Sequence, residues 1–209
     1  MEWNAVLFLG AYHGINPGMG WLFAVALGMQ QGSSRGVWRA VPPIALGHMA
    51  AVGVVLLVAG FAQAVMPVST LKLVVACLLL AFGLFRLWRH RHPRFGGMQV
   101  SFRDLTIWSF LMASAHGAGL MLLPFVMDMS QPVLAAGGSH MHHTSAASLP
   151  WVGALALCLH TLAYLLVLAS AAWIVYQKLG LALLRKAWVN LDLIWSGALV
   201  ATGFFILCF

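Results

Sequence analysis

Apolar residues dominate the chain in long runs, and short polar or basic stretches separate one run from the next. A membrane-spanning helix needs roughly 20 predominantly apolar residues, and six runs are of that order. They cover Trp3–Met29, Pro43–Val65, Leu71–Leu87, Leu105–Met127, Trp151–Tyr176 and Val189–Phe209. The pattern predicts an all-α membrane protein with six transmembrane helices, built as a single integral membrane domain over residues 1–209.

The three runs of the N-terminal half resemble the three runs of the C-terminal half, in the same order. The first run of each half carries a His-Gly pair followed by a proline, and the second carries one histidine near its start. The third runs, LKLVVACLLLAFG and LDLIWSGALVATG, align without a gap. The matched positions are His13 with His116, Pro17 with Pro124, His48 with His160, Lys72 with Asp192, and Gly83 with Gly203.

Each half, residues 1–88 and 103–209, therefore holds three predicted spans. An odd number of spans makes the second half enter the membrane from the opposite side, which is the inverted repeat of many secondary transporters. Prolines remove a backbone donor and kink helices, so we expect helices one and four to be broken or kinked.

Composition agrees with a membrane protein, because 62% of the residues are hydrophobic and only 7% are charged. Soluble domains carry about a quarter charged residues. Apart from Lys72, at the start of the third run, the basic residues lie in three of the loops or at their edges, at Arg35, Arg39, Arg86, Arg89, Arg91, Arg94, Arg103, Lys178, Arg185 and Lys186. By the positive-inside rule these loops are cytoplasmic and both termini lie outside, which suits a bacterial inner membrane.

The same rule accounts for the net charge of +7. A basic total in a membrane protein needs no nucleic-acid partner, so the expected partner is the lipid bilayer. A homo-oligomer or a partner within a membrane complex stays open.

Four histidines fall inside predicted spans: His13, His48, His116 and His160. Ionisable residues within the membrane are expensive, and they normally face the interior of the helix bundle. Neutral imidazole is a common ligand of transition metals, so the four rings form a candidate metal site. Copper, nickel, cobalt and zinc all remain open.

The stretch AYHGINPGMGW places Asn16 and Met19 close to His13 and around Pro17. Broken helices mark substrate sites in transporters. We therefore expect this break to turn Asn16 and Met19 towards a bound ion, with a thioether favouring a soft one.

These residues resemble the first-helix signature H-x4-D-H of nickel/cobalt transporters in the lysine-exporter superfamily. His13 falls on the first histidine and Asn16 on a position where those proteins commonly have another Asp. Gly18 replaces the signature Asp and Met19 the second histidine. The resemblance implies a small transporter with inverted repeats, and the two replacements imply a softer ion or a different substrate.

The stretch before the fifth run, AAGGSHMHHTSAASLP, carries a second candidate metal site in His140, Met141, His142 and His143. Short His-rich tracts often bind metal, and the predicted topology places this loop outside the cell.

A transporter that carries a transition-metal cation past the midplane histidines is the leading hypothesis. The first alternative is a haem-b electron-transfer protein that uses the same four histidines as axial ligands, with Gly14 and Gly117 leaving room for the porphyrin. The second is an intramembrane metalloenzyme, although no carboxylate reaches the middle of a predicted span to act as a base.

Overall fold

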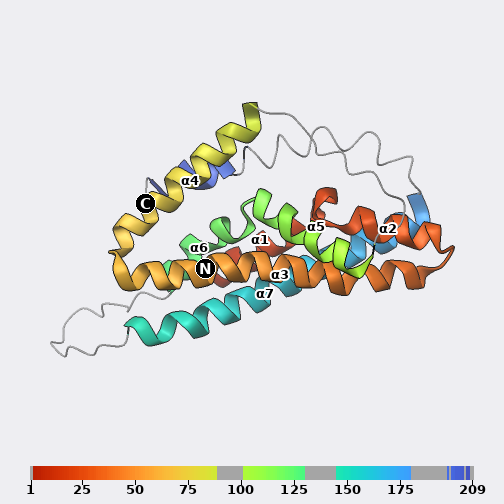
Figure 1. Ribbon diagram of the computed structural model, residues 1–209, viewed down its shortest axis with the longest axis horizontal. Coiled ribbons are helices and arrows are strands. Elements are labelled where there is room, and N and C mark those ends of the chain that lie inside the picture. The colour runs from red at the N-terminus through yellow and green to blue at the C-terminus, as the bar shows by residue number, and fades with distance from the viewer. Residues whose placement is uncertain are drawn as a thin grey trace.

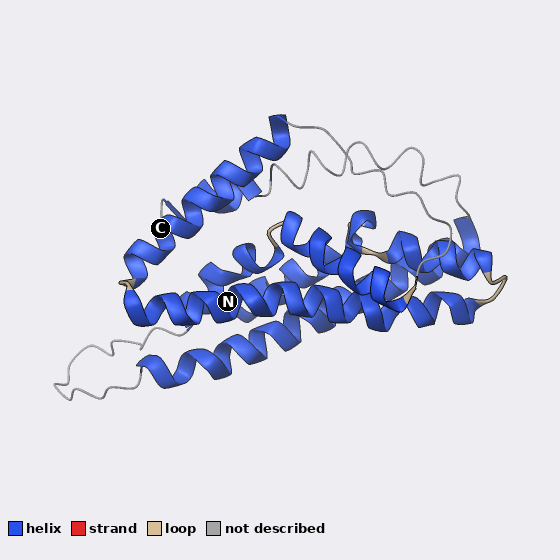
Figure 2. Ribbon diagram, viewed as in Figure 1, coloured by secondary structure: helices blue, strands red, loops and turns tan. Residues whose placement is uncertain are grey.

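The computed structural model describes residues 2–88, 101–129, 145–179, 197, 199–204 and 206–207. Across these ranges the regular structure is helical and contains no strand (Figure 2), which confirms the all-α prediction. The helices are α1 (Glu2–Ile15), the 3-10 turn η1 (Pro17–Met19), α2 (Trp21–Gln30), α3 (Ser34–Val65), α4 (Val68–Trp88), α5 (Phe102–Ala115), α6 (Ala118–Met129), α7 (Ser145–Ile174) and the π-helical turn η2 (Val175–Leu179).

Two continuous helical stretches, Ser34–Gln63 and Trp151–Lys178, are long and apolar enough to cross a membrane. A third span results if α5 and α6, which meet at a bend of 61°, are counted together. Large apolar side chains such as Leu57, Val58 and Phe61 lie exposed on α3, and so wide an apolar surface fits contact with lipid. The helices therefore indicate a membrane protein, while six spans remain a prediction.

The first predicted span is broken between Ile15 and Trp21. Pro17 is the first residue of η1. Its nitrogen carries no hydrogen, so proline is well suited to the first position of a helix. Gly20 then has a φ of 128°, which is a conformation that glycine adopts at little cost. The break predicted at Pro17 is confirmed.

The fourth predicted span is broken as well, but at a different residue from the one that the proline suggests. α5 ends at Ala115, and Gly117 with a φ of 67° joins it to α6. Pro124 lies inside α6. The second break therefore depends on a left-handed glycine next to His116, whereas the first break follows the matching His13-Gly14 pair, which lies within α1.

α3 and α7 form the long axis of the bundle and run antiparallel side by side (Figure 1). Ring contacts join them at two levels, because Trp38 lies 5.8 Å from Trp173 and His48 lies 5.5 Å from His160, measured between ring centroids. As the residue number rises on α3 it falls on α7, which is the mark of an antiparallel pair.

α1 packs along α7 through two glycines one turn apart. A β-carbon at Gly10 would collide with the carbonyl oxygen of His160, and one at Gly14 would lie 2.5 Å from the carbonyl oxygen of Tyr164. This small-xxx-small spacing lets two backbones approach closely in a membrane. The residue numbers rise together on the two helices, so α1 and α7 are parallel.

α5 packs along α3 in the same manner. A β-carbon at Gly47 would collide with the carbonyl oxygen of Thr106, and Gly119 at the start of α6 lies against Val55 further along α3. The Ser109 hydroxyl also donates to the Ile44 carbonyl over 2.7 Å. Along α3 the contacts pass from α5, at Ile44 and Gly47, to α6, at Val55, so α3 runs parallel to the broken span that α5 and α6 form.

α4 rises away from the axis of α3 and packs against the C-terminal helical residues (Figure 1). A β-carbon at Gly83 would meet Val200 at 2.8 Å, and one at Gly203 would meet Leu80 at 2.8 Å. Gly83 and Gly203 are matched positions in the two halves, and Leu80 and Val200 align in the same way. The contact is therefore reciprocal. A Lys72–Asp128 ion pair of 2.7 Å additionally joins α4 to α6.

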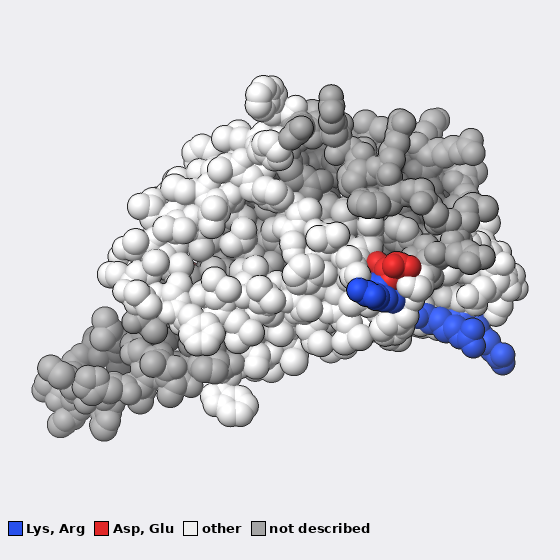
Figure 3. Space-filling view, viewed as in Figure 1, with Lys and Arg blue, Asp and Glu red and all other residues white. Residues whose placement is uncertain are grey.

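Charged side chains are few on the described surface. On the face drawn in Figure 3 they gather towards the end of the molecule where α3 begins, and the other described atoms on that face belong to uncharged residues. Arg35 and Arg39 are exposed in the first turns of α3, as expected for residues at the edge of a membrane.

Candidate functional site

Three of the four predicted histidines form one cluster where α1, α3 and α7 meet. The ring centroids of His13 and His160 lie 5.1 Å apart, those of His48 and His160 5.5 Å, and those of His13 and His48 5.8 Å. None of the three side chains is accessible to solvent. We call His13, His48 and His160 the histidine cluster.

Hydrogen bonds to backbone carbonyls assign the tautomers of two rings in the cluster. His13 Nδ1 lies 2.7 Å from the Leu9 carbonyl oxygen, and His160 Nδ1 lies 3.4 Å from that of Val6. A carbonyl only accepts, so each Nδ1 carries the hydrogen and donates it. In a neutral ring Nε2 then bears the lone pair, and an Nδ1–H donated to a carbonyl is how metal-binding histidines are usually held.

His48 differs because neither of its ring nitrogens has a hydrogen-bond partner, although both are buried. It is held instead by stacking, since its ring lies 3.9 Å from that of Tyr164 at an angle of 14°. A buried polar group without a partner costs free energy. His48 is therefore the ring whose nitrogens have most to gain from a ligand.

The fourth histidine, His116, lies at the break between α5 and α6 and is also buried. Its Nδ1 donates to the Met112 carbonyl over 2.7 Å, which is the same bond, to the fourth residue before it, that His13 makes to Leu9. The structure thus brings His13, His48 and His160 into ring contact and gives His116 a backbone hydrogen bond that matches that of His13.

Asn16 and Met19 are both buried, but they serve the break itself. The Asn16 Oδ1 accepts from the Gly18 N–H over 2.8 Å, so the carbonyl expected to face a cation caps η1. The Met19 side chain packs in the apolar cluster around Ala24 and Leu168. The break therefore uses these two residues for local structure.

Side chains also satisfy the backbone groups that the break releases. The Trp21 Nε1–H donates to the Ile15 carbonyl over 3.0 Å, and the Tyr164 hydroxyl donates to the Met19 carbonyl over 2.6 Å. Irregular backbone at membrane depth is tolerated where such partners exist. The Ile15 and Met19 carbonyls thus have partners within the protein.

Sequence reasoning did not select Tyr164, which joins the break to the cluster. Its hydroxyl holds the Met19 carbonyl while its ring stacks on His48. It stands four residues after His160, and this i, i+4 spacing places two side chains on one helix face. That spacing is the signal that could have identified it.

Within the described ranges, no three His, Cys, Asp or Glu side chains are arranged to hold a metal ion. Coordination by all three rings of the cluster therefore requires at least one of them to turn. His48 can turn without losing a hydrogen bond.

The packing around the helix breaks leaves little space for haem. The site beside Gly14 is filled by the backbone of α7, and a β-carbon at Gly117 would lie 2.9 Å from Leu199. The room that small residues at 14 and 117 would give a porphyrin is thus occupied by neighbouring helices.

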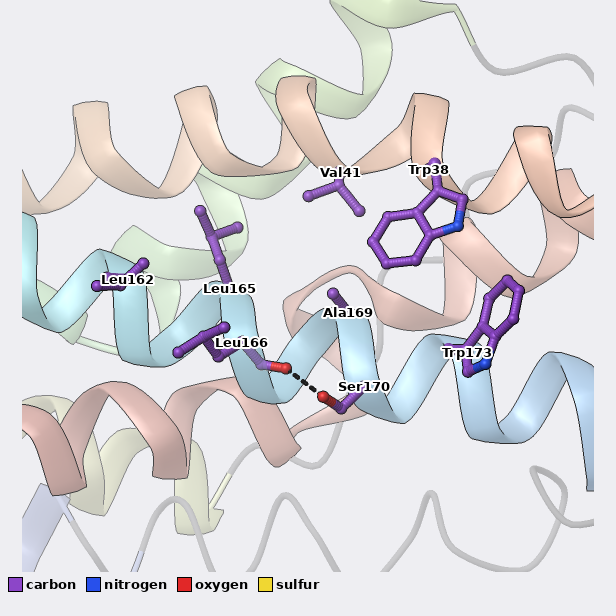
Figure 4. Close-up of a pocket in the computed structure, with 8 residues that line it drawn as sticks. All are labelled: Trp38, Val41, Leu162, Leu165, Leu166, Ala169, Ser170 and Trp173. Carbon is purple, nitrogen blue, oxygen red and sulfur yellow. Dashed lines mark hydrogen bonds between the residues drawn. The ribbon is translucent and has the colours of Figure 1, made fainter.

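Two further features lie apart from the cluster. The candidate loop site at His140, Met141, His142 and His143 falls outside the described residues. An open groove between α3 and α7 is lined by apolar side chains together with Ser170, and Trp38 and Trp173 lie at one end of it (Figure 4). No histidine lines this groove, so it is separate from the cluster.

No protein-family model, curated protein or solved structure matches the chain.

Proposed function

We propose that the protein is a membrane transporter for a transition-metal cation, which it binds at His13, His48 and His160. The observation that carries this proposal is the meeting of three buried imidazoles inside a bundle of apolar helices. A buried polar cluster is costly in a membrane and commonly marks an ion or substrate pathway. The lone pairs on Nε2 of His13 and His160 supply ligands of the type that these metals prefer.

The spacing of the rings fits a shared ion. A metal lies about 2 Å from a coordinating imidazole nitrogen and hence about 3 Å from the ring centre, so two rings at a tetrahedral or trigonal angle have centres about 5 to 5.5 Å apart. The observed separations run from 5.1 to 5.8 Å. A rotation of His48 in place is then enough to bring a third nitrogen towards the ion.

Helix pairing supports an inverted repeat as the frame of this transporter. α1 lies parallel to α7 and the broken span of α5 and α6 lies parallel to α3, so the first span of each half pairs with the second span of the other half. The hydrogen bonds of His13 and His116 correspond, and so do the contacts of Gly83 and Gly203. A two-fold axis between α3 and α7 would pass beside His48 and His160, where the ion is proposed to bind.

Such a frame provides a way to move the ion. In inverted-repeat transporters one part of the molecule rocks against the other around a fixed central site. The break after His13 lies next to the cluster, and the breaks after His13 and at His116 divide each broken span into two segments that can move separately.

Transport by reconstituted vesicles tests the proposal. Purified protein in proteoliposomes should move at least one of Cu⁺, Ni²⁺, Co²⁺ and Zn²⁺ faster than protein-free vesicles do. His13→Leu, His48→Leu and His160→Leu should each lower that flux at least tenfold, because each removes a ligand. The control is His90→Gln, which removes a histidine of the basic RHRHP stretch.

A flux that survives in the His13→Leu/His48→Leu/His160→Leu variant would contradict the assigned site. The absence of any flux in the wild-type protein, with all four metals tested in both directions, would contradict the function.

A further inference from the structure

We infer that the histidine cluster selects a soft monovalent cation, Cu⁺ or its analogue Ag⁺, over divalent transition metals. The inference rests on the proposed function and concerns the charge that this part of the bundle can hold. It follows from where the acidic residues lie and from the kind of ligands that surround the cluster.

Carboxylates lie far from the cluster along the described helices. The chain contains four acidic residues: Glu2, Asp104, Asp128 and Asp192. Glu2 is eleven residues before His13 on α1, a distance of about 16 Å at the helical rise. Asp104 takes part in the N-terminal cap of α5, Asp128 pairs with Lys72, and both are exposed. Asp192 lies outside the described residues.

The described ligands around the cluster are therefore neutral, and none of them offsets the charge of a bound ion. The cost of moving an ion from water into a medium of low dielectric rises with the square of its charge, so a divalent ion costs about four times as much as a monovalent ion of the same size. Sites that hold divalent ions usually reduce this cost with carboxylates or thiolates. A cluster of neutral imidazoles favours the single charge.

Ligand chemistry points the same way. Imidazole and thioether groups suit Cu⁺. Among the described contacts of Gly18, at the break after His13, the one thioether is that of Met112, whose methyl group would lie 3.3 Å from a β-carbon there. Cu⁺ and Ag⁺ also form stable complexes with a coordination number of two or three, whereas Zn²⁺ is almost always four-coordinate in closed protein sites. His13 and His160, with a rotated His48 as a third ligand, can supply this lower coordination number.

Equilibrium dialysis of the purified protein in chloride-free buffer tests the selectivity. The probes are Ag⁺, Cu⁺ under a reductant, Zn²⁺, Ni²⁺ and Co²⁺, each alone and then in pairs. We expect Ag⁺ and Cu⁺ to bind at least tenfold more tightly than any divalent ion. His48→Leu should weaken that binding at least tenfold, with His90→Gln as the control.

A matched pair of variants tests the charge argument. His48→Asp places a carboxylate in the cluster, and His48→Asn places a neutral group of the same shape there. The Asp variant should improve the ratio of Zn²⁺ to Ag⁺ affinity at least tenfold over the Asn variant. If the Asp variant does not elute as a monodisperse species, the wild-type selectivity decides the matter.

The outcomes separate the two claims. Binding of Zn²⁺, Ni²⁺ or Co²⁺ that equals or exceeds binding of Ag⁺ overturns this inference and leaves the proposed function standing. Equal Zn²⁺ to Ag⁺ ratios in His48→Asp and His48→Asn overturn the charge argument. Failure of every tested ion to bind overturns the proposed function itself.

Discussion

At the scale of single residues, Tyr164 joins the histidine cluster to the break of the first span. The Tyr164 ring stacks on His48, and its hydroxyl ties α7 to the Met19 carbonyl at the break of the first span. The side chain is fully buried. One residue therefore connects the position of an unbonded imidazole with the geometry of the broken helix.

Tyr164→Phe should keep the stacking and remove the hydroxyl. The Met19 carbonyl then stays buried without its partner, which costs about 1 to 3 kcal/mol. We expect a lower unfolding temperature in detergent by scanning fluorimetry. Ser170→Ala, which removes an exposed hydroxyl from the same helix, should change the stability by less than about 0.5 kcal/mol. Equal effects of the two substitutions would contradict this role for Tyr164.

Asn16 gives a second prediction at this scale, because its Oδ1 caps η1. Asn16→Ala should lower the free energy of unfolding by about 0.5 to 2 kcal/mol through loss of the cap. Asn16→Ser should be milder, since a hydroxyl oxygen still accepts from the Gly18 N–H. The test is urea unfolding of the two variants in the same detergent. A loss for Ser as large as that for Ala would show that the cap is not what this residue contributes.

At the scale of elements, the two helix breaks show what sequence can and cannot predict. Pro17 predicted the first break correctly, because a proline ring is poorly tolerated in the interior of a helix. The second was expected near Pro124, but it occurs at Gly117, and nothing local distinguishes that glycine from Gly119 inside α6. The neighbours of Gly117 at the break are Leu79 and Leu199, which come from distant parts of the chain.

The same limit applies to the site. The matched histidines could be found from sequence, because four ionisable residues stand out in apolar runs. The meeting of His13, His48 and His160 in one cluster depends on the register between helices. The roles of Asn16 and Tyr164 depend on individual hydrogen bonds, which composition and spacing do not encode.

The glycines between α1 and α7 give the prediction for elements. Gly14→Ala puts a β-carbon 2.5 Å from the Tyr164 carbonyl oxygen, so the helices must separate, at a cost of about 1 to 3 kcal/mol. Gly53→Ala in α3 is the control, because its nearest contact is Leu157 at 3.6 Å. The control should be neutral or should stabilise by up to about 1 kcal/mol. Thermal unfolding of both variants checks this, and a tolerated Gly14→Ala would contradict the close packing.

At the scale of the whole molecule, the positions of the basic residues and the directions of the paired helices are consistent with the same arrangement in the membrane. The parallel pair α1·α7 and the pair that α3 forms with the span of α5 and α6 run in opposite directions, because α3 and α7 are antiparallel. This is the geometry that two oppositely inserted halves require. From the positive-inside rule we expect the start of α3 to lie in the cytoplasm and the start of α7 outside.

Single cysteines in a background without Cys77, Cys158 and Cys208 test this orientation. A cysteine at Ser34 should react only with a membrane-permeant maleimide, whereas one at Ser145 should react with an impermeant maleimide added to intact cells. The reverse labelling pattern would contradict the orientation. Labelling of both sites from the same side would contradict a single crossing by α3 or α7.

The central claim is that His13, His48 and His160 together bind the transported cation. X-ray absorption spectroscopy of protein loaded with one equivalent of Cu⁺ tests it most directly. The account predicts a first shell of nitrogen atoms with the outer-shell scattering of two or three imidazole rings, reduced by one ring in His48→Leu if all three bind. A spectrum without imidazole scattering, or one unchanged in the His13→Leu/His48→Leu/His160→Leu variant, would contradict the claim.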